Sequence, residues 1–134
     1  MWTVYNDKTA KEICYGCGSD ISKKTYAYFH AAQHYFYSAD KVMSEIYDGK
    51  ALYFATRAKN HIRLIEIAVR TEYQGQGIGR KVLNRLLTRA KALGTTKITL
   101  RTPINEKAAE FWLHMGAKII GLKDNDYEME LNIK

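Results

Sequence analysis

The stretch that decides the fold reads Gln74-Gly75-Gln76-Gly77-Ile78-Gly79-Arg80. It follows an apolar run of residues 64–69 and precedes residues 80–93, whose apolar positions recur with helical periodicity. Three of the nine glycines in the chain therefore fall between a predicted strand and a predicted helix. Glycine lets the backbone approach a ligand closely, and the free N–H groups of a new helix point at an anion. The stretch thus predicts a loop that binds a phosphate-bearing ligand.

Two common phosphate-binding loops do not match this stretch. The dinucleotide pattern G-x-G-x-x-G fails because, counted from Gly75, the third glycine comes one residue early. Counted from Gly77, the position of the third glycine is occupied by Val82. A Walker A loop ends in Gly-Lys-Ser/Thr, whereas Gly79 is followed by Arg80 and Lys81.

The pattern that does fit is Q-x-x-G-x-G, carried by Gln74, Gly77 and Gly79. It resembles the acyl-CoA loop of the GNAT superfamily of N-acyltransferases, and Asn105-x-x-Ala108 resembles the start of the family's next helix. The resemblance covers residues 62–133, with the elements in the expected order. It implies an α/β (α+β) fold with a mixed, mostly antiparallel central sheet and helices on both faces. We expect residues 1–134 to form a single domain of this kind.

The resemblance also implies which residues bind the acyl donor, acetyl-CoA. Backbone groups of the strand before the loop would bind the pantetheine arm, and one N–H would polarise the thioester carbonyl. The loop would bind the pyrophosphate, and an asparagine amide would hold the cofactor. The residues at these positions are Ile67, Ala68, Val69, Gln74, Gly75, Gln76, Gly77, Ile78, Gly79, Arg80 and Asn105.

Acyl transfer to an amine needs the amine neutral, so a general base is useful, and an acid can protonate the leaving thiolate. Glu66, flanked by apolar residues on a predicted central strand, is the candidate base, because burial raises the pKa of a carboxylate. The alternative is that Glu66 only pairs with Arg57 or Arg63 across a hairpin. Many relatives place a tyrosine acid where this chain has Trp112, so Tyr127 is the candidate acid, with Tyr73 or solvent as alternatives.

Both cysteines and two of the four histidines form a second pattern, Cys14-x2-Cys17-x12-His30-x3-His34. This spacing is typical of two-Cys-two-His zinc sites, and the two histidines would lie one helical turn apart. The pattern predicts a structural zinc site with four protein ligands. The alternative is a buried cysteine pair beside two helix histidines.

Composition limits the class of protein and its partners. The chain has 134 residues, and 21 basic against 14 acidic residues give a net charge of +7. The excess basic charge between residues 80 and 107 suits a phosphate-bearing ligand, a nucleic acid or an acidic protein surface. The two cysteines and the lack of a membrane-length apolar run or signal sequence lead us to expect a cytoplasmic protein with no membrane partner.

Periodicity and turn residues predict the remaining elements. Predicted helices are residues 22–37, 40–47, 80–93 and 105–115. Ser22 is the predicted cap of the first helix, and Ser38 or Asp40 that of the second. Predicted strands are residues 2–5, 52–55, 62–69, 97–101, 117–122 and 127–133. Residues 6–24 are expected to form a loop that the metal anchors.

The function these patterns favour is acetyl-CoA-dependent N-acetyl transfer to an amine, by direct attack in a ternary complex. The acceptor would be a small molecule, a protein amine or an amine recognised on a nucleic acid. The alternative from a different class is a non-catalytic module that binds coenzyme A, nucleic acid or a protein partner.

Overall fold

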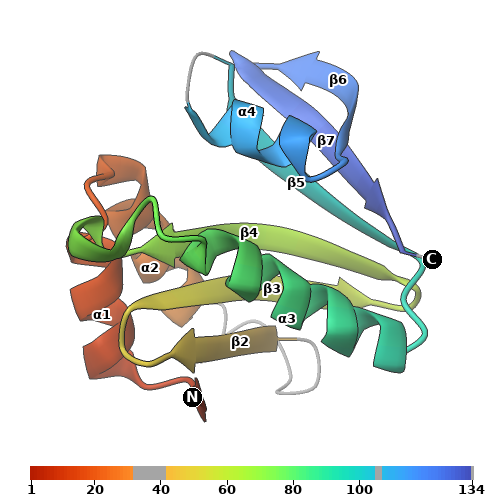
Figure 1. Ribbon diagram of the computed structural model, residues 1–134. Coiled ribbons are helices and arrows are strands. Elements are labelled where there is room, and N and C mark those ends of the chain that lie inside the picture. Colours follow the sequence, from red (N-terminus) through yellow and green to blue (C-terminus); the bar gives the residue numbers. More distant parts are fainter. Residues whose placement is uncertain (32–41, 105–106, 134) are drawn as a thin grey trace.

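The computed structural model describes residues 1–31, 42–104 and 107–133 (Figure 1). These residues form a seven-stranded sheet in the order β1-β2-β3-β4-β5-β7-β6. The strands are β1 (Trp2–Val4), β2 (Val42–Tyr47), β3 (Ala51–Ala58), β4 (His61–Val69), β5 (Lys97–Pro103), β6 (Lys118–Lys123) and β7 (Asp126–Asn132). The helices are α1 (Asp7–Tyr15), α2 (Asp20–Ala31), the 3₁₀ helix η2 (Thr71–Tyr73), α3 (Ile78–Ala92) and α4 (Lys107–His114). The pair β4–β5 is parallel and the other neighbouring strands are antiparallel.

Helices cover both faces of the sheet, as predicted (Figure 1). On one face, the apolar stripe of α3 packs with Tyr53 of β3, Ile98 of β5 and Trp112 of α4. On the other face, α1 and α2 pack against the middle of the sheet, where the Phe29 ring stacks on Phe54 at 4.2 Å. The sheet is therefore buried on both sides at its centre. Within the described ranges, no helix is long and apolar enough to cross a bilayer.

The prediction of a helix over residues 40–47 is wrong, because residues 42–47 form strand β2. Both faces of β2 are covered: Met43 packs in the α3 cluster and Ile46 in the α1–α2 cluster. A strand buried on both faces loses the alternation that identifies strands, so its apolar positions imitate a helix. The following Asp48 and Gly49, with φ of 50° and 66°, begin the three-residue connection, residues 48–50, to β3. The proposed caps before this segment lie outside the described residues.

Helix α1 and the start of α2 replace most of the predicted loop of residues 6–24. Asn6 accepts a hydrogen bond from the backbone N–H of Thr9 at 3.0 Å and so caps the helix. Its buried stripe is small, consisting of Ala10, Ile13 and Cys14. Helix α2 begins at Asp20, so Ser22 is inside the helix rather than at its cap.

Candidate active site

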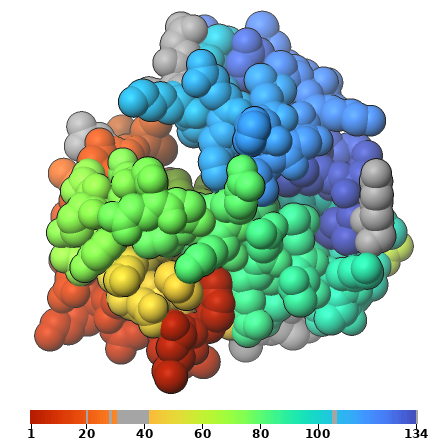
Figure 2. Space-filling model, viewed as in Figure 1, coloured from red at the N-terminus to blue at the C-terminus, as the bar shows by residue number. Residues whose placement is uncertain are grey.

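The sheet opens between β4 and β5. The two strands pair over only three residues, from His61 opposite Lys97 to Arg63 opposite Thr99. Beyond that point β4 keeps β3 as its partner and β5 keeps β7, so their facing edges separate. A cleft of about 610 Å³ fills the opening, lined by residues 64–69 of β4, residues 100–103 of β5, and parts of α2 and α4. In Figure 2 the surface is hollowed between the green η2–α3 segment and the blue α4 segment.

Glu66 lies in this cleft. A β-bulge at Ile65 interrupts the pairing of β4 with β3, since Leu64 pairs with Ala55 but Glu66 pairs with Phe54. Ile65 packs against the α1–α2 cluster, and the Oγ of Ser22 on α2 donates to Oε2 of Glu66 at 3.2 Å. Burial raises the pKa of Glu66 from its usual 4.5 to about 7, and the hydroxyl groups of Ser22 and Thr25 oppose that rise. This carboxylate can accept a proton near neutral pH.

The open edge of β4 presents backbone groups to the cleft. The N–H of Arg70 donates to the carbonyl of Lys50 at 2.9 Å, so these two residues, which adjoin the ends of β4 and β3, form a hydrogen-bonded pair. Hydrogen-bonded and non-hydrogen-bonded pairs alternate along antiparallel strands, so the N–H and C=O of Ala68 also point toward β3. Those of Ile67 and Val69 point the other way, into the cleft. The backbone of Ile67 and the N–H of Val69 are thus available to a ligand.

The glycine loop ends at a helix terminus that is ready for an anion. Gly77 has φ +78° and precedes α3, where no side chain caps the helix and the first turn holds no acidic residue. A Cβ added at Gly75 or Gly77 would meet no atom within 4 Å, so the space beside the loop is free. The first helical bond is from the N–H of Lys81 to the carbonyl of Gly77, at 3.2 Å. The preceding N–H groups, of residues 78–80, remain as donors.

Gln74 ties this loop to the cleft. Its Nε2 donates to the carbonyl of Val69, at the end of β4, and to the carbonyl of Cys17, after α1, both at 2.9 Å. The N–H of Thr71 donates to the carbonyl of Gly16 at 2.9 Å, in the same contact. The structure therefore brings together the predicted loop, the open edge of β4 and the candidate base. Arg80 is exposed beside the loop, whereas Nζ of Lys81 donates to the Tyr47 hydroxyl at 3.5 Å.

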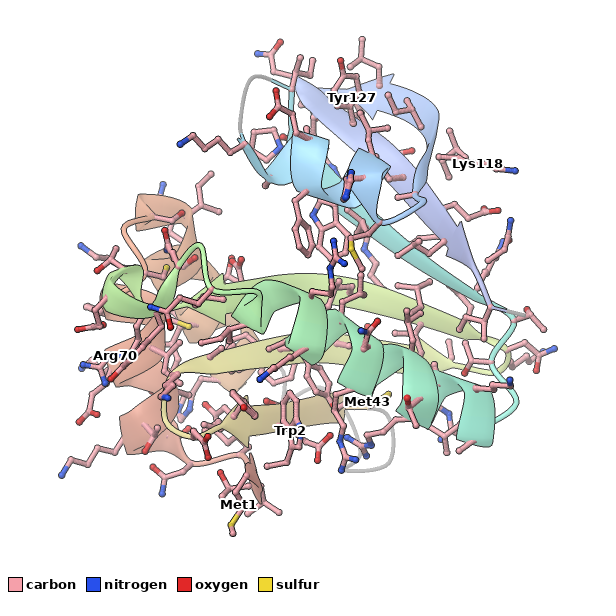
Figure 3. All side chains as sticks on the ribbon, in the orientation of Figure 1. Met1, Trp2, Met43, Arg70, Lys118 and Tyr127 are labelled. Atoms are coloured by element: carbon pink, nitrogen blue, oxygen red, sulfur yellow. The ribbon has the colours of Figure 1, made fainter. Side chains whose placement is uncertain are left out.

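The other candidates for acid–base chemistry lie elsewhere. Tyr127 is not among the described residues that line the cleft; it is half-buried on β7 and packs against the α3 cluster. In Figure 3 it appears near the β6–β7 turn, with α4 between it and β4. Trp112 lines the cleft as a buried residue of α4, and Asn105 lies outside the described residues. Tyr73 is partly buried in η2 under Nζ of Lys50, 4.9 Å from the ring centre.

The structure does not support the predicted zinc site. Cys14 is fully buried in the apolar α1–α2 cluster, where burial raises the pKa of its thiol to about 12 and so disfavours the thiolate that zinc requires. Cys17 donates from Sγ to the carbonyl of Cys14 at 3.3 Å, and Nδ1 of His30 lies 3.0 Å from Oδ1 of Asp7. Among the described residues, no three His, Cys, Asp or Glu side chains are placed to hold a metal. His34 lies outside those residues.

Two polar residues of the cleft were missed by the sequence prediction. Thr102 is 2% exposed, and its Oγ1 has no hydrogen-bond partner in the described part of the chain. The sequence signal for Thr102 is its position, because it is a polar residue at the next inward-facing position of β5 after Ile98 and Leu100. Ser22 was interpreted as a helix cap, and only the structure shows its bond to Glu66.

The comparisons with known proteins agree with this geometry. The model of the Acetyltransferase (GNAT) family matches residues 12–117. The ribosomal-protein-S18-alanine N-acetyltransferase of Escherichia coli superposes with a TM-score of 0.79 at 18% identity, covering 100% of this chain and 94% of that one. The PaiA N-acetyltransferase of Thermoplasma acidophilum, solved with coenzyme A, gives 0.76 at 13% identity, with 98% of each chain covered.

An aminoglycoside 6'-N-acetyltransferase complexed with coenzyme A also gives a TM-score of 0.76, at 13% identity, covering 100% of this chain and 97% of that one. No curated protein matches the sequence. At these identities the solved structures establish the fold, and the family model establishes membership over most of the chain. The chain therefore belongs to the GNAT family of acetyltransferases.

Proposed function

We propose that this protein transfers the acetyl group of acetyl-CoA to an amine, by direct attack within a ternary complex. The observation that carries the proposal is a cleft that holds a partly buried carboxylate of raised pKa and is lined by Gln74, the first residue of the loop that leads to the terminus of α3. An anion is favoured at the helix terminus and a proton at the carboxylate. An acyl transfer from coenzyme A to an amine needs both.

The residues present fit coenzyme A. The N–H groups of residues 78–80 and the free space at Gly75 and Gly77 suit the pyrophosphate. The open edge of β4 at Ile67 and Val69 suits the amide groups of the pantetheine arm. On the opposite wall, the hydroxyl of Thr102, which has no hydrogen-bond partner among the described residues, offers one more donor and acceptor to a ligand in the cleft.

Acetyl-CoA, when bound, supplies a thioester carbonyl that is open to attack by an amine. The chain's own part is electrostatic and acid–base. A backbone N–H of the open β4 edge stabilises negative charge that develops on a carbonyl oxygen. The carboxylate of Glu66 removes the proton that the amine must lose, directly or through one water molecule. Because no tyrosine is among the described residues lining the cleft, we propose that solvent protonates the thiolate.

The acceptor would enter on the side of the cleft lined by α2, where Ser22 and Thr25 lie near Glu66. The solved neighbours act on two kinds of amine, an alanine of a ribosomal protein and an aminoglycoside. Peptide amino termini and aminoglycosides are therefore the first acceptors to try.

The test combines binding and turnover. Calorimetry with coenzyme A should show saturable binding, and thiol release from acetyl-CoA should rise with one class of amine in a panel of peptides, aminoglycosides and polyamines. Absence of binding would refute the site. Binding without turnover on every amine would favour the non-catalytic alternative.

A further inference from the structure

The buried Ser22 and the partly buried Glu66 form a polar pair that the GNAT membership does not explain. Ser22 is 2% exposed, lies in the first turns of α2, and donates to Oε2 of Glu66 at 3.2 Å. Both side chains line the same cleft. A polar group is costly to bury unless it is hydrogen-bonded, and here each group is the partner of the other.

The hydroxyl of Thr25, also on α2, has a different hydrogen-bond acceptor. Thr25 also lines the cleft, but its Oγ1 donates to the carbonyl of Ile21 at 3.0 Å, within its own helix. Its proton is directed at that carbonyl, but the Thr25 side chain also lowers the pKa of Glu66. Ser22 differs because its hydroxyl donates directly to Oε2 of Glu66, at 3.2 Å.

The charged and titratable groups on the other elements around Glu66 do not take the place of this hydrogen bond. From α1, Cys14 stays neutral because burial raises the pKa of its thiol to about 12, and Cys17 lines the cleft beyond it. From β5, Arg101 lines the cleft but is paired with Asp126 at 3.2 Å. From β3, the residue opposite Glu66 is the apolar Phe54.

We propose that Ser22 is a positioning residue for Glu66: its hydroxyl holds Oε2 in place and leaves Oε1 for the proton of the acceptor amine. The inference rests on the proposed function, in which Glu66 is the base. The hydrogen bond has a second effect, because it favours the ionised carboxylate against the desolvation that raises its pKa. Ser22 therefore orients the base and, in the same direction as Thr25, lowers the pH at which the base becomes active.

The experiment follows the Glu66 carboxyl carbon by ¹³C NMR titration of the full-length protein, with Glu66→Gln to assign the signal. Ser22→Ala should raise the pKa of Glu66 by about one unit, since a hydrogen bond to a charged group contributes about that much. Ser22→Thr, which keeps the hydroxyl, should titrate close to wild type, and Thr25→Val should shift the pKa less than Ser22→Ala. Ser44→Ala, which removes a hydroxyl on β2 outside the cleft, is the matched control and should cause no shift.

Turnover supplies the second readout. The pKa of Glu66 is near 7 in the wild type and is expected to be one unit higher in Ser22→Ala. The ionised fraction of Glu66 in the variant should therefore be about tenfold lower than in the wild type at pH 6, and the two fractions should become nearly equal near pH 9. The acid limb of the pH–rate profile should move by the same amount. A merely structural role for Ser22 would lower the rate equally at every pH.

An unshifted Glu66 titration in Ser22→Ala would overturn the proposal, and so would an acid limb that stays in place. If Ser22→Ala does not fold, Ser22→Cys, whose thiol is a weak donor, should shift the titration in the same direction. If the wild-type protein does not bind coenzyme A, the proposed function is refuted instead. The carboxyl titration needs no ligand, so the two failures are distinguishable.

Discussion

Gly77 offers a direct test of the anion site, through a pair of variants that differ by one charge. Gly77→Asp and Gly77→Asn place side chains of nearly equal size at the terminus of α3. The backbone at Gly77 is left-handed, with φ +78° and ψ 9°, which costs most L residues about 1 kcal/mol but which Asn and Asp tolerate best. An added Cβ meets no atom within 4 Å, so neither variant should clash with the protein.

The expected effect on stability is small. Either side chain can cap the free N–H groups of α3, and a cap contributes about 0.5–2 kcal/mol, which offsets the backbone strain. The added Asp charge also lies at the positive end of the helix dipole and is favourable there. Thermal unfolding of both variants should therefore stay close to that of the wild type.

The expected effect on coenzyme A binding is large and depends on charge. Two like charges about 5 Å apart repel by about 1 kcal/mol in water and about 3 kcal/mol at an effective dielectric constant of 20. Because Gly77 is exposed, the lower part of this range is appropriate, which means that Gly77→Asp should bind roughly 5- to 50-fold more weakly than Gly77→Asn.

Calorimetry at two ionic strengths checks this reasoning. The difference between the two variants should shrink at about 0.5 M salt, because exposed charges are screened. Equal affinities of the Asp and Asn variants at low salt would show that no phosphate group lies at this helix terminus. The assignment of the glycine loop would then be wrong, whatever the protein catalyses.

Three further predictions concern single residues. Glu66→Gln should lower turnover by about 10²-fold with coenzyme A binding intact. Because folding raises the pKa of Glu66 from 4.5 to about 7, the wild type loses stability as the pH rises between these values. In denaturant unfolding the variant should therefore be up to about 3 kcal/mol more stable than the wild type at pH 8, and equally stable below pH 4.5. Tyr127→Phe should change kcat by less than about twofold in the thiol-release assay, whereas a loss of about 10²-fold would identify Tyr127 as the acid after all. Arg85→Met should lower the free energy of unfolding by about 1–3 kcal/mol in urea, because Arg85 bonds Glu45 through Nε at 3.0 Å and Nη2 at 2.9 Å, and an unchanged midpoint would show that Arg89 and Tyr53 suffice.

The C-terminal half was predictable because its signals are local. The glycine loop, the amphipathic stripe of α3 and the alternation of β5 each depend on short-range sequence, and the structure confirms these elements. Two elements of the N-terminal half, β2 and α1, were not predictable in this way, because they are defined by what covers them. Strand β2 is buried on both faces, and α1 has a stripe with one large residue, Ile13. Neither leaves a clear period in the sequence.

The lack of support for the zinc prediction has a related reason. Four spaced residues indicate a site only if the chain between them brings their side chains together. Here α1 and α2 are separate helices, and Cys14 is turned into the apolar cluster with Ile13 and Phe29. The cysteine contributes to packing, which is the more common fate of a buried thiol.

The candidate base depends on a feature that no spacing pattern records. Along a regular strand, residues two apart share a face, so Leu64, which packs in the α3 cluster, would carry Glu66 to that same face. The bulge at Ile65 adds one residue to β4 and reverses the alternation. Val69 again packs toward α3, while Glu66 meets Ser22 of α2. One extra residue thus places the carboxylate on the α2 side of the cleft, and the same strand has an open backbone edge for the proposed acyl donor. The candidate base and the proposed anion-binding loop are close in the chain because β4 carries the first and leads through η2 into the second.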